Sequence, residues 1–113
     1  MNTKTMGTMN EQTARIQQME QYLDCASAAI KELSDALEKY LKAQTALSEL
    51  GTYYGSEQWK EDFASDEAGL LPSDLKRGVL SEDGIWNVLS DSHELNIRLS
   101  EVLTYLLRHH QKM

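Results

Sequence analysis

Residues 16–47 read IQQMEQYLDCASAAIKELSDALEKYLKAQTAL, and this stretch decides the fold class. Its apolar residues return at alternating steps of three and four, which is the spacing of one face of an α-helix. In heptad terms, the a and d positions are Ile16, Met19, Leu23, Ala26, Ile30, Leu33, Leu37, Tyr40, Gln44 and Leu47. The pattern predicts one long amphipathic helix from about residue 10 to Leu50.

A second column of apolar residues runs beside this face, one position before each a residue. The column consists of Tyr22, Ala29, Ala36, Ala43 and Leu50. Together, the a, d and g positions form an apolar face wider than the contact strip of a two-stranded coiled coil. The width predicts that the helix packs against more than one neighbour, and it favours a homodimer.

The same spacing returns near the other end of the sequence. A helix is expected to begin at Ser81, a good N-cap residue. Its apolar positions are Ile85, Val88, Ser92, Leu95, Leu99, Val102 and Leu106. No segment alternates with the period of two that is typical of a strand.

These patterns predict an all-α fold. The expected architecture is a long antiparallel helical hairpin with one or two short helices in the connector. Leu33 and Leu99 are expected to lie centrally in its core. Such a hairpin can stand alone or form half of a dimeric four-helix bundle.

The connector is marked by its glycines, because residues 51–84 hold five of the six glycines and the only proline. Gly51 is expected to end the first helix. A short helix should begin after Ser56 as its N-cap and end at Gly69. A further turn is expected to start at Pro72-Ser73-Asp74 and to stop at Gly78.

The 113-residue chain is expected to form a single helical domain over residues 10–113, after a flexible N-terminal tail over residues 1–9. Its net charge of −7 disfavours binding to nucleic acid or to an anionic membrane. No stretch is apolar enough to span a membrane. Cys25 is the only cysteine, so a reducing cytoplasm is the expected location.

Two stretches of the connector, YYGSEQWKED (53–62) and LPSDLKRGVLSED (71–83), resemble a known family. This family is the domain of unknown function numbered 4298, which consists of small, uncharacterised bacterial helical proteins. The resemblance covers roughly residues 10–110. It implies an all-α fold and a bacterial cytoplasmic source, and it carries over no catalytic residue and no ligand.

Basic residues near the second helix could bind a small anion. Lys76 and Arg77 precede Ser81, where exposed backbone N–H groups could receive a phosphate or a carboxylate. The two cations could instead only neutralise neighbouring acids, and this plainer interpretation is favoured. No G-x-x-x-x-G-K-[ST] motif supports a nucleotide site.

Five of the eight aromatic residues gather in or beside the connector, namely Tyr53, Tyr54, Trp59, Phe63 and Trp86. They could line a pocket for a flat ligand or for a partner's side chain. They could also form a satellite core that holds a glycine-rich connector in place, which is the favoured interpretation.

The acids of the connector could in principle bind Mg²⁺ or Ca²⁺, which prefer several converging carboxylates. They are Glu57, Glu61, Asp62, Asp66, Glu67, Asp74, Glu82 and Asp83. The calcium-loop motif is absent, and a solvated acidic face is the favoured interpretation.

His93, His109 and His110 lack metal-ligand spacing, and Cys25 lies beside Asp24, which disfavours a thiolate nucleophile. No catalytic residue, metal site or cofactor is predicted.

Two functions remain open from the sequence. The favoured one is a non-catalytic interaction or self-association module that binds a second copy of itself or another helical protein. The alternative is a small-ligand or metal-dependent site, with or without enzymatic activity, around residues 53–83. The binding residues of that site would be Tyr53, Tyr54, Trp59, Lys76, Arg77 and Ser81.

Overall fold

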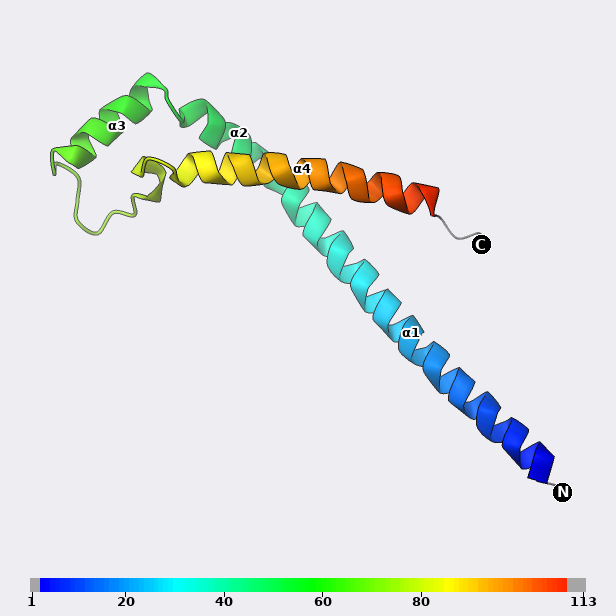
Figure 1. Cartoon of the computed structure of the whole chain (residues 1–113). Helices are drawn as coiled ribbons and strands as arrows, with labels where there is room; N and C mark the ends of the chain where they lie inside the picture. The colour runs from blue at the N-terminus through cyan, green and yellow to red at the C-terminus, as the bar shows by residue number, and fades with distance from the viewer. Residues whose placement is uncertain (1–2, 110–113) are drawn as a thin grey trace. The chain divides into compact units, whose positions relative to one another are not determined.

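The computed structural model describes residues 3–109, with side chains from residue 10 onward. The elements in that range are α1 (Thr3–Lys42), α2 (Gln44–Tyr53), α3 (Glu57–Glu67), the 3₁₀ turn η1 (Gly78–Leu80) and α4 (Gly84–Arg108), as Figure 1 shows. Over the described residues there is no strand. The predicted all-α fold is therefore confirmed.

The chain divides into two compact units, residues 1–43 and residues 44–113. Unit 1 is formed by α1. From residue 10 to its end, α1 contains no glycine or proline, so nothing in the sequence interrupts its hydrogen-bond ladder. None of the helices in residues 3–109 combines the length and the apolar character needed to cross a membrane.

The ends of the first helical stretch differ from the prediction. α1 begins at Thr3, earlier than the expected start near residue 10, and the stretch is divided at Ala43. The N–H of Ala43 is shared between the carbonyls of Lys39 and Tyr40, each at 3.1 Å. Such a shared bond is typical of a local tightening of the helix.

The prediction that Gly51 ends the first helix is wrong, because α2 continues to Tyr53. The chain turns at Gly55 instead, where φ is +77°. The N–H of Ser56 donates to the carbonyl of Tyr53 at 2.9 Å and closes this turn. Only glycine adopts such a left-handed backbone without strain, so the stop signal lies four residues further along the chain.

The short helix of the connector follows its predicted signals. The Ser56 hydroxyl accepts a hydrogen bond from the N–H of Trp59 at 3.1 Å and caps α3. At the other end Gly69 has a φ of +71°. The N–H of Leu70 donates to the carbonyl of Ser65, and that of Gly69 to the carbonyl of Asp66. This pattern is a Schellman motif, which satisfies the last carbonyls of the helix.

The second half of the connector departs from the prediction at two residues. A turn is closed between Pro72 and Leu75, as expected, but Gly78 begins η1 rather than stopping a turn. α4 starts at Gly84, three residues after the expected N-cap Ser81. The Ser81 hydroxyl nevertheless accepts a hydrogen bond from the N–H of Gly84 at 3.1 Å. The serine therefore acts as a capping group for a helix that begins later than predicted.

Unit 2 packs around the junction of η1 and α4. In this unit α2 contacts α4 and runs in the opposite direction, and η1 contacts both α3 and α4 (Figure 1). The buried core of the described residues consists of Leu80 and Ile85, which are 6% and 2% exposed. α2 has only ten residues. The observed antiparallel pair is therefore short, and the long hairpin stays a prediction.

The central leucines of the predicted hairpin do not form the core. Leu33 is 57% exposed, and Leu99 is only half-buried. Their positions at the centre of each apolar face correctly mark the face, but burial requires a neighbour at the same height along the helix. In unit 2, Leu50 of α2 lies in one groove with Ile85 and Val88, near the start of α4.

Candidate functional site

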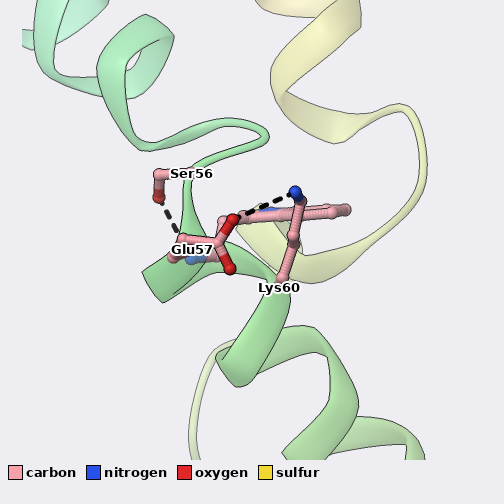
Figure 2. A network of polar contacts seen from close by, with 4 residues as sticks. Ser56, Glu57 and Lys60 are labelled. Atoms are coloured by element: carbon pink, nitrogen blue, oxygen red, sulfur yellow. Dashed lines mark hydrogen bonds and ion pairs between the residues drawn. The ribbon is translucent and has the colours of Figure 1, made fainter.

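The start of α3 organises the connector. Figure 2 shows Ser56, Glu57 and Lys60 together at this point, with the Ser56 cap and the ion pair between Lys60 Nζ and Glu57 Oε1 at 3.3 Å. Both charged side chains are mostly exposed. An exposed pair of this kind contributes little stability, whereas the serine cap satisfies a backbone donor at the helix start.

Trp59 is the centre of the aromatic cluster. Its indole Nε1–H donates to the carbonyl of Val79 at 2.9 Å, which joins α3 to η1 across 20 residues of sequence. The Tyr54 ring meets the Trp59 ring edge-on at 5.4 Å between centroids, and the Phe63 ring stacks on it at 5.2 Å. Trp59 and Phe63 are four residues apart on α3, so their rings lie on the same face of that helix. Trp86 is 57% exposed and forms none of these ring pairs.

The two tyrosines before the turn also bind other segments. The Tyr54 hydroxyl donates to the carbonyl of Glu82 at 3.4 Å, and the Tyr53 hydroxyl donates to Asp62 Oδ2 at 2.6 Å. The hydrogen bond to Asp62, followed by partial burial and the charge of Asp62, raises the pKa of Tyr53 from 10.0 to about 12. Each of these phenols therefore holds part of the connector in place.

The two basic residues differ in their surroundings. Arg77 forms an ion pair with Asp66, with 2.7 Å between Nη1 and Oδ1, and both side chains are partly buried. Lys76 is exposed. The pairing occupies Arg77 with a carboxylate of its own chain, so of the two bases Lys76 is the one whose position suits an incoming anion.

The Ser81 side chain forms hydrogen bonds with two backbone groups nearby in the sequence. Its hydroxyl donates to the carbonyl of Gly78 at 2.8 Å and accepts from the N–H of Gly84. A side chain at Gly84 would collide with both groups. The structure thus explains why glycine stands at the first residue of α4, and the sequence prediction missed this close approach.

A shallow groove of about 510 Å³ lies in unit 2. It is mostly apolar, and its lining residues are Leu50, Lys76, Gly78, Val79, Gly84, Ile85 and Val88. Of the six predicted binding residues, only Lys76 lines this groove. The other five hold the connector together through the contacts described above. The sequence prediction missed Leu50, Val79 and Val88 because they belong to three separate segments.

The acidic connector forms no metal centre in the described residues. Within residues 10–109, no group of three or more His, Cys, Asp or Glu side chains is positioned to hold a metal ion. His109 stacks on Tyr105, and its Nδ1 lies 2.8 Å from the Tyr105 carbonyl. Cys25 is an exposed free thiol, and His110 lies outside the described residues.

A second candidate surface is the apolar face of α1. We name it the α1 seam and define it by Ile16, Met19, Leu23, Ala26, Ile30, Leu33 and Leu37. Its large side chains are between 38% (Leu37) and 70% (Ile30) exposed. A continuous stripe of exposed aliphatic side chains is typical of an interaction surface rather than of a solvated helix face.

The comparison with family models covers most of the chain. The family described as "Domain of unknown function (DUF4298)" matches residues 16–102, a range that includes the α1 seam, the connector and most of α4. No curated protein and no solved structure matches the chain. The resemblance predicted from the connector is therefore confirmed, and the chain belongs to the DUF4298 family.

Proposed function

We propose that the protein is a non-catalytic helical module that associates with another helix through the α1 seam. The observation that carries this proposal is the exposure of the seam, in which Leu23 is 61% and Ile30 is 70% exposed. Placing such side chains in contact with a partner removes apolar surface from water, which is the main driving force of protein association. A heptad spacing is also the pattern that helix partners recognise.

The long antiparallel hairpin is part of this proposal. α2 and α4 already pack together, and Leu50 lies in the same groove as Ile85 and Val88. A longer hairpin would extend this antiparallel pairing beyond the ten residues of α2.

A second copy of this protein is the first partner that we propose for the seam. The a, d and g positions form a face wide enough for more than one neighbour, so a second copy can pack there. The lone exposed thiol of Cys25 fits a reducing compartment, for which we propose the bacterial cytoplasm.

Sedimentation velocity over a wide range of concentration tests the proposed function. The wild-type chain should form an assembly of more than one copy, whereas Ile30→Lys should sediment as a single chain. Ala28→Lys is the matched control, because it adds the same charge at an f position on the opposite face of α1. A single-chain mass for the wild type at every concentration would rule out self-association.

The groove of unit 2 supports a second candidate function, the binding of a small aliphatic anion. Val79, Ile85 and Val88 offer apolar contacts, and the Lys76 ammonium group lies at the same groove. Ligand pockets usually combine an apolar lining with a few charged or polar groups that orient the ligand. This candidate keeps Lys76 from the predicted site and replaces the aromatic residues by aliphatic ones.

Titration of isotope-labelled protein with octanoate, followed by amide chemical shifts, tests the groove. Binding should shift the signals of Gly78, Val79, Gly84 and Val88. Lys76→Gln should weaken binding several-fold, and Lys60→Gln on α3 serves as the control that should not. Shifts spread along α1 instead would show that octanoate only coats exposed apolar surface.

A further inference from the structure

We infer that two copies of α1 pack antiparallel, with Leu23 of each copy opposite Ala26 of the other. This inference rests on the proposed function and names its partner, orientation and register. The central part of the seam forms the interface, and the two-fold axis passes between residues 24 and 25. Two features of α1 select this arrangement: the apolar layers and the flanking charges.

The first feature is the fit of the apolar layers. In this register Ile16 faces Leu33, Met19 faces Ile30, and Leu23 faces Ala26, each pair occurring twice by symmetry. All six layers are apolar, and in the two central ones a large side chain meets a small one. A parallel, in-register pair would place Ala26 opposite Ala26 and leave a gap at the centre. Alternation of large and small residues across facing positions fills a helix interface without voids.

The second feature is the pair of charges that flank the seam. Within residues 10–43, Arg15 and Glu20 are the only charged residues at g and e positions. In the inferred register Arg15 comes beside Glu32 of the other copy, and Glu20 comes beside Lys31. Both contacts join opposite charges. Lys31 pairs with Asp35 on its own helix, at 3.0 Å and well exposed, so it can exchange partners at small cost.

Neighbouring registers lack this complementarity. Moving one heptad toward the N-termini brings Glu20 beside Asp24 of the other copy, and also beside Glu20 itself. Moving one heptad the other way brings Glu20 beside Glu38, and Arg15 beside Lys39. Flanking charges of this kind set the pairing and orientation of coiled coils, because like charges in contact are unfavourable.

The same charges identify the occupant as a second copy of this chain. Arg15, Glu20, Lys31 and Glu32 all lie on α1, so the seam is complementary to itself in this register.

Distances between spin labels test the orientation, and the chain offers a native site for them. Cys25 is the only cysteine, and it is exposed. In the inferred dimer the two Cys25 residues lie at the same height, so their labels should be separated by little more than the width of the helix pair. The second protein is Cys25→Ser with Lys39→Cys, in which residue 39 comes opposite residue 10. Its labels should be about 44 Å apart, from 29 residues at 1.5 Å per residue.

The distances separate failure of this inference from failure of the proposed function. Short distances at both sites would establish a parallel pair and overturn the inference, although self-association would stand. A long distance at Cys25 would establish another register, with the same consequence. A single-chain mass at every concentration would overturn both. If Lys39→Cys disturbs the helix, Cys25→Ser with Ala14→Cys is the substitute, with an expected separation of about 32 Å.

A charge exchange tests the register independently. Glu20→Lys should weaken dimerisation several-fold, because it places two lysines in contact across the interface. Adding Lys31→Glu to the same chain should restore the wild-type dissociation constant, since the two charges then simply change places. Gln21→Lys, which adds a positive charge outside the interface, is the control. Failure of the double variant to recover would overturn the assignment of Glu20 to Lys31.

Discussion

From Ile16 to Leu37, α1 carries the most regular apolar spacing of the chain, yet its large seam side chains are at least 38% exposed. The junction of η1 and α4 is interrupted by Gly78 and Gly84, yet it supplies both buried residues, Leu80 and Ile85. Regular spacing therefore identifies a face that can be buried, and not the neighbour that buries it. In unit 2 the neighbours come from a folded connector. For the α1 seam, the neighbour that we propose is a second copy of the chain.

Truncation of the core should give the largest effect and separate the two regions most clearly. Ile85→Ala should lower the free energy of unfolding of unit 2 by about 2–5 kcal/mol, because it removes a fully buried side chain. Tryptophan fluorescence during denaturation is the suitable measurement, since Trp59 and Trp86 both lie in unit 2. Leu33→Ala in α1 should leave this transition within about 0.5 kcal/mol. Equal effects would show that the two regions unfold as one.

A pair of glycine substitutions should give opposite signs. Gly84→Ala should destabilise unit 2 by about 1–3 kcal/mol, because its Cβ would collide with the Gly78 carbonyl and the Ser81 hydroxyl. Gly51→Ala should stabilise it by about 0.5–1 kcal/mol, since this residue is helical and its Cβ meets no other group. The midpoint of a urea transition measures both. A loss of stability for Gly51→Ala would mean that α2 ends earlier than described.

Substitution of the two basic residues of the connector should change the free energy of unfolding by smaller and unequal amounts. Arg77→Ala should cost about 1 kcal/mol, because it leaves the partly buried Asp66 carboxylate without its partner. Lys76→Ala should remain within about 0.5 kcal/mol. Thermal unfolding followed by fluorescence compares the two variants. A larger loss for Lys76→Ala would mean that this residue holds the connector and is not available to a ligand.

The smallest effect on stability is expected when a rise in pH deprotonates Tyr53. The pKa of Tyr53 is raised to about 12, so the folded state retains a phenol proton that the unfolded state loses from about pH 10 upward. The stabilisation is complete below pH 10 and is lost as the pH rises toward 12. The fall in stability over this range should be smaller for Tyr53→Phe than for the wild type. Identical pH profiles would contradict a stable bond between Tyr53 and Asp62.

Helix ends could be predicted from the sequence where the residues that end the helix lie within a few positions of each other. Ser56 caps α3 through a hydroxyl three residues away, and Gly69 supplies a left-handed backbone, so both helix ends could be predicted. Gly51 looked like an equally good stop, but the turn that ends α2 is made at Gly55. Choosing between two glycines requires the contacts of Tyr53 and Tyr54 with segments further along the chain.

The candidate site shows the same limit. The aromatic cluster around Trp59 could be predicted, because Trp59 and Phe63 are four residues apart on one helix. The bond from Trp59 to Val79 and the groove that joins Leu50 to Ile85 connect residues at least 20 positions apart. The spacing of apolar residues along the sequence does not predict contacts between such distant residues. Tyr53, Tyr54, Arg77 and Ser81 were predicted as binding residues, and the contacts that the structure shows for them are with other parts of the connector.

The sequence alone indicates that the chain is helical, which face of each long helix is apolar, and where α3 begins and ends. These properties follow from side-chain spacing and capping within a few residues, which act before any tertiary contact forms. The folded structure adds that Leu80 and Ile85 form the core of the described residues, that Gly84 has no room for a side chain, and that Arg77 pairs with Asp66. These features could not be predicted because burial and close approach depend on which distant segments meet, and in unit 2 the folded connector brings those segments together.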